Sequence, residues 1–243
     1  MTYRILWPAM RWPNERHIEE SSVAGHIAEF SDRYEDVTGE QWTNCDAVVS
    51  VKDIPEEYRK RMTKCRIFVT PKVGFDNING KAWAELGVPL CNVPDYGTQE
   101  VADHAMALML SLMKGITFHT RELKQDPGGL WRPALNPFGK RLSNCTFGVV
   151  GLGRIGTAAA LRAKAFNMDV VMYDPYRENG AELALGIRRV HSLTNLFSQC
   201  DVVSLHLPLS AATEKLINAE VLSHSKSGLI LINTARGPII DLD

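Results

Sequence analysis

The sequence contains no apolar run long and uninterrupted enough to span a bilayer, which takes about 20 residues. Its N-terminus, MTYRILWP, has neither the apolar core nor the small-residue cleavage site of a signal peptide. No dense cluster of lysine and arginine occurs and the net charge is −1, so we expect no nucleic-acid partner. Together these absences predict a cytoplasmic protein without a membrane partner.

Cysteine is scarce, and the few cysteines follow no recognisable pattern. Neither a CxxC pair nor a metal-type spacing occurs among Cys45, Cys65, Cys91, Cys145 and Cys200. We therefore expect reduced, buried thiols and no metal site. The 243 residues, 45% hydrophobic and 23% charged, are enough for two globular domains, each with its own core.

The strongest signal that the sequence does contain is a glycine fingerprint. Gly151, Gly153 and Gly156 follow an apolar run at 147–150 and open an alanine-rich segment at 157–166. The pattern is typical of a strand, a tight turn and a helix, in which the glycines allow a sharp turn, close approach of a pyrophosphate and helix–strand packing. The helix N-terminus then offers free amides to the phosphates. The alternative is a glycine turn in an ordinary βαβ unit.

An acidic residue follows at the position that a dinucleotide site requires. Asp174 directly follows a second apolar run at 169–173. It lies roughly 20 residues after the glycine fingerprint, the spacing at which a carboxylate binds the adenosine ribose. Because a carboxylate there would repel a 2′-phosphate, NAD is favoured over NADP. Arg177 is the contrary hint, since a nearby arginine can accept a phosphate.

Before the fingerprint, apolar runs alternate with helix-like segments. This alternation predicts an α/β domain with a doubly wound parallel sheet over residues 1–97. We expect four strands at 3–7, 47–51, 67–69 and 88–93, with helices at 15–30, 55–65 and 78–86. A single long helix is then expected from 98 to about 125, followed by a Pro/Gly-rich loop that carries Trp131.

The second domain, residues 98–243, is predicted to be of the same α/β class. Its expected strands lie at 146–150, 169–173, 187–190, 201–205 and 228–233. A dinucleotide-binding domain normally has six strands, so we expect this domain to be incomplete at its C-terminus.

Four segments, in order and spacing, resemble the D-isomer-specific 2-hydroxyacid dehydrogenases, a family that includes phosphoglycerate, glyoxylate and formate dehydrogenases and the C-terminal-binding-protein corepressors. They are VGFDNIN at 73–79, NVPDYGTQEVADH at 92–104, the fingerprint at 151–156, and LHLPL at 205–209 followed by NTARG at 233–237. The resemblance covers nearly the whole chain. It implies a flavodoxin-like substrate-binding (lid) domain, a Rossmann NAD-binding domain and a homodimer.

The resemblance also implies roles for particular residues. The substrate carboxylate would be held by the backbone amides of Val73 and Gly74 and by Arg236, which the family uses as a catalytic residue; a surface salt bridge is the alternative reading of Arg236. An arginine fork matches a carboxylate and stays charged. The expected NAD contacts are Gly151, Gly153, Arg154, Ile155, Gly156, Asp174, Leu207, Pro208, Thr234, Ala235 and Arg236.

The implied function is NAD-dependent interconversion of a 2-keto acid and a D-2-hydroxy acid. The family's glutamate and its proton-donating histidine would both lie C-terminal to Arg236, and the 243 residues contain neither. The alternatives are therefore an NAD-binding, corepressor-like protein without catalysis, or an inactive truncated remnant. His104 and His206 lie near the site in sequence, and we expect both to be scaffold residues rather than proton donors.

Overall fold

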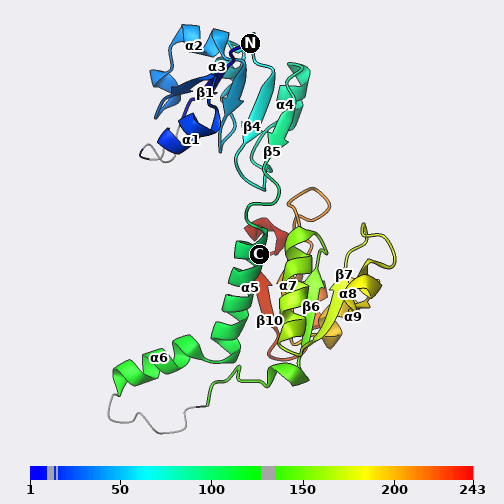
Figure 1. Ribbon diagram of the computed structural model, residues 1–243. Helices are drawn as coiled ribbons and strands as arrows, with labels where there is room; N and C mark the ends of the chain where they lie inside the picture. Colours follow the sequence, from blue (N-terminus) through cyan, green and yellow to red (C-terminus); the bar gives the residue numbers. More distant parts are fainter. Residues whose placement is uncertain (10–13, 15, 127–134, 243) are drawn as a thin grey trace. The chain divides into compact units, whose positions relative to one another are not determined.

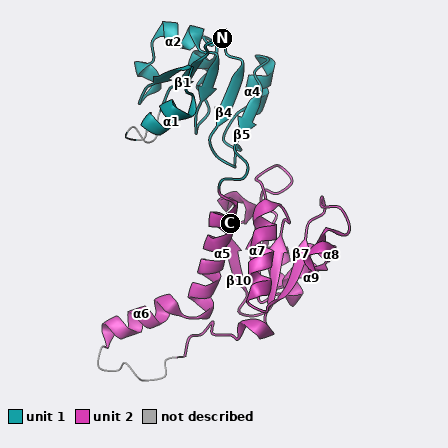
Figure 2. Ribbon diagram, viewed as in Figure 1, with its two compact units in different colours: residues 1–96 teal, residues 97–243 magenta. Residues whose placement is uncertain are grey.

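The chain folds into two compact units, residues 1–96 and residues 97–243 (Figure 2). The computed structural model describes residues 1–9, 14, 16–126 and 135–242. Trp131 lies outside the described residues. Each unit is a parallel β-sheet with helices packed on it (Figure 1), which confirms the predicted α/β class.

Unit 1 contains a five-stranded parallel sheet in the order β2-β1-β3-β4-β5. This is the flavodoxin-like order, in which the first strand lies inside the sheet. The core of the unit includes the fully buried side chains of Leu6, Trp42, Phe68 and Trp83. Its elements are β1 (Arg4–Trp7), α1 (Arg16–Ser22), β2 (Ile27–Phe30), α2 (Gly39–Asn44), β3 (Ala47–Val49), α3 (Glu56–Arg59), β4 (Ile67–Thr70), α4 (Gly80–Glu85) and β5 (Leu90–Asn92).

The prediction of one helix over residues 15–30 is wrong, and with it the prediction of four strands. The helix ends at Ser22, and Gly25, at φ +89°, reverses the chain into strand β2. Positive φ is easily adopted only by glycine, so the turn is encoded at that residue. The edge strand β2 pairs with β1 from Arg4↔Ile27 to Trp7↔Phe30.

The predicted long helix is also two helices. Helix α5 (Thr98–Met113) ends before Gly115, which has φ +63°, and α6 (Ile116–Gln125) continues in a new direction (Figure 1). An added Cβ at Gly115 would lie 2.9 Å from the Asn136 side chain, and that side chain donates to the carbonyl of Leu112 at the end of α5. A left-handed glycine therefore breaks the apolar periodicity that suggested one helix.

Unit 2 contains the second parallel sheet, in the order β10-β9-β6-β7-β8. Strand β6 is central and the chain order reverses between β6 and β9. In α/β sheets this reversal marks the place where ligands bind, at the carboxyl ends of the strands. The remaining elements are β6 (Thr146–Val150), α7 (Arg154–Ala165), β7 (Asp169–Tyr173), α8 (Ala181–Leu185), β8 (Arg188–Arg189), α9 (Leu193–Gln199), β9 (Val202–Leu205), α10 (Ala219–Ser223) and β10 (Ile230–Asn233).

Helix α5 packs on α7 within unit 2, and its inner face supplies Ala105, Met106, Met109 and Met113 to the core. Four of the five cysteines are buried, as expected, whereas Cys91 is exposed. In the described part of the chain, no helix combines the length and apolar character needed to cross a membrane.

Candidate cofactor-binding site

The glycine fingerprint forms the turn between β6 and α7, and two of its glycines are required by geometry. Gly151 has φ +91°, and a Cβ there would lie 2.6 Å from the carbonyl oxygen of His206. A Cβ at Gly156 would lie 1.9 Å from the carbonyl oxygen of Gly151. Gly153 is different, because an added Cβ would meet no described atom within 4 Å. The turn is thus tightly packed at Gly151 and Gly156 and has free space beside Gly153.

Helix α7 begins at this open position with its first amides uncapped. Gly153 is the N-cap, and among the described residues no side chain caps the helix. The first amide to bond back into the helix is that of Thr157, which donates to the carbonyl of Gly153. The amides of Arg154, Ile155 and Gly156 therefore have no partner within the helix. Such an end attracts anions through its free N–H groups and its partial positive charge.

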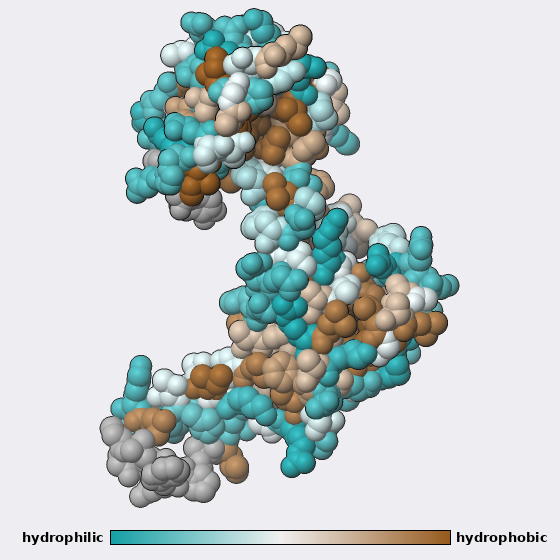
Figure 3. Space-filling view, in the orientation of Figure 1, coloured by the Kyte–Doolittle hydropathy of each residue, from teal (hydrophilic) through white to brown (hydrophobic). Residues whose placement is uncertain are grey.

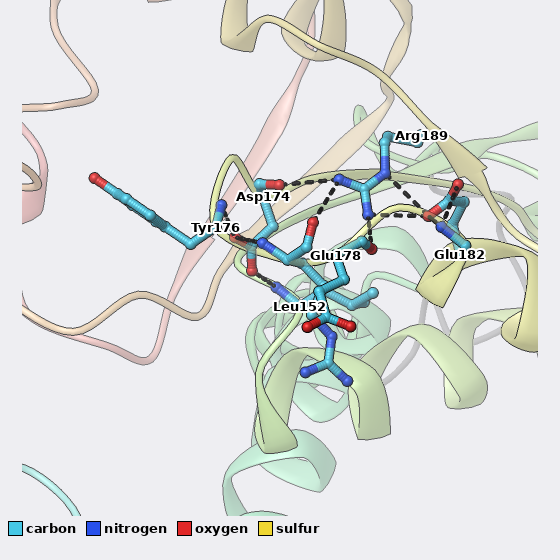
Figure 4. Close-up of polar contacts among 8 residues, drawn as sticks. Leu152, Asp174, Tyr176, Glu178, Glu182 and Arg189 are labelled. Atoms are coloured by element: carbon cyan, nitrogen blue, oxygen red, sulfur yellow. Dashed lines mark hydrogen bonds and ion pairs between the residues drawn. The ribbon is translucent and has the colours of Figure 1, made fainter.

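Asp174 follows β7 and faces the same turn. One carboxylate oxygen, Oδ2, accepts from the amide of Leu152 at 2.8 Å (Figure 4). The other, Oδ1, accepts from the amides of Tyr176 at 2.9 Å and Arg177 at 3.1 Å. A carboxylate offers about four lone-pair sites, so these three amides leave room for about one further donor such as a ribose hydroxyl.

The end of β9 packs directly on the first glycine. His206 donates its amide to the carbonyl of Val150, and the Leu207 side chain would lie 2.8 Å from a Cβ at Gly151. Pro208 is exposed and its carbonyl accepts the Thr213 hydroxyl at 2.6 Å. The structure thus brings Leu207 against the glycine turn.

The segment after β10 is folded by the side chain of Asn233. Its amide group donates to the carbonyl of Arg236 at 2.8 Å, and its oxygen accepts from the amide of Ala235 at 3.0 Å. The Thr234 hydroxyl between them is buried and has no partner in the described residues. Asn233 was not predicted as a site residue, because its role is to shape the turn that presents Thr234 and Arg236.

An open depression of about 640 Å³ lies beside the N-terminus of α7. Two arginines, Arg154 and Arg177, line it together with Gly153. The other lining residues are Thr98, Gln99, Thr157, Ala158 and Leu161. Thr98 and Gln99 were missed from the sequence, since they come from α5, far from the fingerprint along the chain.

The two predicted substrate-binding amides belong to unit 1. Val73 and Gly74 follow β4, and the carbonyl of Val73 accepts the side-chain amide of Asn92 at 2.8 Å. Within the described residues, the amide nitrogens of Val73 and Gly74 make no hydrogen bond that would occupy them. They are therefore free to donate to an anion.

His206 is partly buried, and this loss of contact with solvent lowers its pKa to about 4. Its Nε2 lies 2.9 Å from the hydroxyl of Ser204 in β9. A histidine with such a low pKa is neutral at pH 7 and has no imidazolium proton to give. His104 is exposed on α5. At pH 7 His206 is therefore not suited to donate a proton.

The pKa of His206 predicts an acid-sensitive fold. Its pKa is about 6.5 in the unfolded chain and about 4 in the folded one, so between these values only the unfolded chain takes up the proton. The free energy of unfolding should fall by about 2 to 3 kcal/mol between pH 7 and pH 4.5 from this group. Urea unfolding at both pH values, compared with His206→Gln, measures it. The prediction would be refuted if His206→Gln left the pH dependence of the unfolding free energy unchanged. It would also be refuted if the exposed control His104→Gln changed that dependence as much as His206→Gln does.

The arrangement fits a dinucleotide. The uncapped α7 end can hold a pyrophosphate, Asp174 has an acceptor position left for a ribose hydroxyl, and Gly153 leaves space where a side chain would obstruct the ligand. The hydroxyls of Thr98 and Thr234 are buried and have no partner among the described residues. Thr98 lines the depression beside α7, and Thr234 directly follows strand β10. A buried polar group without a partner is costly, and a polar ligand could satisfy it.

Comparison with known proteins agrees with this geometry. Residues 106–243 match the family description "D-isomer specific 2-hydroxyacid dehydrogenase, NAD binding domain". Glyoxylate reductase of Korarchaeum cryptofilum is 36% identical over 83% of this chain. C-terminal-binding protein 1 of Caenorhabditis elegans is 34% identical over 69% of it. The chain spans 61% of the length of the first and 24% of the second.

A solved structure shows the same fold over nearly the whole chain. D-lactate dehydrogenase of Aquifex aeolicus, in complex with NAD and lactic acid, superposes with a TM-score of 0.81 at 26% identity, covering 98% of this chain and 70% of that one. The family match extends over more than half of the 243 residues. The chain therefore belongs to the D-isomer specific 2-hydroxyacid dehydrogenase family, and its unit 2 contains the NAD-binding domain of that family.

Proposed function

We propose that this chain binds NAD and a 2-keto or 2-hydroxy acid as an oxidoreductase that interconverts a 2-keto acid and a D-2-hydroxy acid. The observation that carries the proposal is the uncapped N-terminus of α7 beside the carboxylate of Asp174. This pairing of an anion site with a ribose acceptor is what a dinucleotide requires.

Unit 2 would hold NAD with the residues already described. The amides of Arg154 and Ile155 would donate to the pyrophosphate, and Asp174 would accept from the ribose. Leu207, Pro208, Thr234 and Ala235, at the carboxyl ends of β9 and β10, would border the nicotinamide half. When bound, NAD accepts or donates the hydride.

Arg236 would bind the substrate carboxylate, because its planar fork matches two carboxylate oxygens and remains charged at any physiological pH. The amides of Val73 and Gly74 are proposed to donate to the same carboxylate. His206, which is neutral at pH 7, is not proposed to supply the proton to the carbonyl oxygen. The substrate itself is proposed only as a class, small 2-keto acids such as glyoxylate and pyruvate.

A second candidate is an NAD-binding protein without turnover. It is favoured by the 34% identity to C-terminal-binding protein 1. The two candidates share the cofactor site and differ only in catalysis.

Titration of NADH fluorescence with the 243-residue protein tests the NAD binding that both candidates require. Saturable binding that is tighter for NADH than for NADPH is expected, and no saturable binding would reject both candidates. Turnover is then assayed with glyoxylate and with pyruvate. NADH oxidation that depends on either acid and is lost in Arg236→Gln supports the oxidoreductase; binding without turnover supports the second candidate.

We also propose a homodimer formed through α5 and α6. Exposed apolar side chains on these helices include Leu108, Leu112, Ile116 and Leu123. Figure 1 shows α6 extending away from the sheet of unit 2, and in Figure 3 its surface mixes apolar and polar side chains. Sedimentation equilibrium should give twice the chain mass of 27.1 kDa. A mass equal to one chain at micromolar concentration would reject the dimer.

A further inference from the structure

Arg189 is an almost buried arginine outside the set of residues expected to touch NAD. Its side chain is 9% exposed, and its ion-pair partner Glu182 is 13% exposed. Arg189 belongs to the short edge strand β8, where it pairs with Met172 of β7. It is therefore placed beside β7, which ends one residue before Asp174.

The guanidinium of Arg189 is fully used. Its Nε donates to Oε2 of Glu182 at 3.0 Å, and its Nη2 forms an ion pair with the same oxygen at 2.9 Å. The remaining three bonds go to backbone carbonyls, those of Asp174 and Arg177 from Nη1 at 3.2 Å each and that of Glu178 from Nη2 at 2.8 Å (Figure 4). All three nitrogens of the guanidinium are therefore engaged, in four hydrogen bonds and one ion pair.

The three carbonyls belong to the loop of residues 174–178, which carries the ribose-binding carboxylate. From the opposite side, the Asp174 carboxylate accepts the amides of Tyr176 and Arg177 in the same loop. The loop is thus held between two charged groups, Arg189 on its carbonyls and Asp174 on its amides. Movement of the loop away from Arg189 would carry the Asp174 backbone with it.

We propose that Arg189 is a positioning residue for the dinucleotide. It fixes the loop of residues 174–178 so that the Asp174 carboxylate stays beside the glycine turn, ready for a ribose hydroxyl. This inference rests on the proposed NAD binding. Glu182 has a secondary role, since it orients the guanidinium. Lysine cannot replace Arg189 fully, because an ammonium offers three donors instead of five.

The neighbouring Arg188 provides a matched control. Its side chain is 53% exposed and pairs with Asp169 at the start of β7, not with the loop. Arg188→Met and Arg189→Met thus remove the same functional group one residue apart, and only the second removes bonds to the loop. Surface ion pairs contribute little to stability, so Arg188→Met should leave the fold intact.

The test is a double-mutant cycle on NADH binding, measured by fluorescence titration of the 243-residue protein. Arg189→Met should raise the Kd about tenfold, and Arg188→Met less than about twofold. If Arg189 acts through Asp174, Arg189→Met should add less than about twofold in the Asp174→Ala background. The preference for NADH over NADPH should also fall in Arg189→Met, a change that general destabilisation would not produce.

If Arg189→Met does not give a cooperative melt, Arg189→Lys takes its place in the cycle, with an expected increase of about threefold. The inference would be overturned if the Kd increases of Arg189→Met and Asp174→Ala multiplied fully in the double variant. It would also be overturned if either of these two single variants kept the wild-type Kd. Both outcomes would leave NAD binding by the wild type intact. Absence of NADH binding by the wild type would instead reject the proposed function, and the inference would fall with it.

Discussion

Replacing Gly156 with alanine is expected to abolish NADH binding and to destabilise unit 2 by about 3 kcal/mol or more. The added Cβ would lie 1.9 Å from the carbonyl oxygen of Gly151 and 3.2 Å from the side chain of Val149. Both clashing atoms belong to the central strand or the turn that follows it, so neither can move without displacing β6 or α7. Urea unfolding and NADH titration measure the two effects.

Gly153→Ala is the control for this change. No described atom lies within 4 Å of its added Cβ, and Gly153 has φ −76°, which alanine adopts freely. The free energy of unfolding should therefore change by less than about 1 kcal/mol. NADH affinity should still fall, because the methyl group occupies space next to the uncapped helix end. If Gly156→Ala were as stable as Gly153→Ala, the close packing of the turn would be wrong.

Replacing Asp174 with alanine is expected to raise the Kd for NADH by about 10- to 100-fold, the range of one or two charge-assisted hydrogen bonds. The same change should bring the affinities for NADH and NADPH close together, since a carboxylate at this position repels a 2′-phosphate. Fluorescence titration with both nucleotides gives the two constants directly.

Asp174→Asn separates charge from shape in this prediction. Asparagine keeps one oxygen that can accept some of the bonds from Leu152, Tyr176 and Arg177, but it is neutral. It should retain more NADH affinity than alanine and still lose the discrimination against NADPH. Unchanged discrimination in both variants would mean that Asp174 does not face the ribose, and that another group, such as Arg177, sets the preference.

Much of the fold was predictable, because parallel strands buried on both faces read as short apolar runs and the glycines mark the β6–α7 turn. Strand β2 was missed for a physical reason. It is an edge strand with a partly exposed pattern, so its four residues lack the apolar run that marks a central strand. Gly115 was missed as a break because the apolar spacing continues on both sides of it.

The residues of the site also divide into those that the local sequence predicts and those that it does not. Gly151, Gly156 and Asp174 are set by local geometry, and their positions in the structure suit the roles proposed for them. Arg189 bonds to the carbonyl of Asp174, and Thr98 lines the depression beside α7; both come from segments distant in sequence from the glycine turn. A buried arginine in a two-residue strand has no local signature, since its neighbour Arg188 is exposed and has the same side chain.

The pairing of β6 has a consequence for how the protein forms. On one side β6 pairs with β7, the next strand along the chain, but on the other it pairs with β9, from Phe147↔Val202 to Val150↔Leu205. Contacts between distant parts of a chain close slowly, and during synthesis the N-terminal part emerges first. The glycine turn and Asp174 can therefore assemble while Leu207 and Thr234 are still unfolded or unmade. The nascent chain would acquire its phosphate-binding half first, and the crevice at the strand reversal would be completed in the last steps of folding.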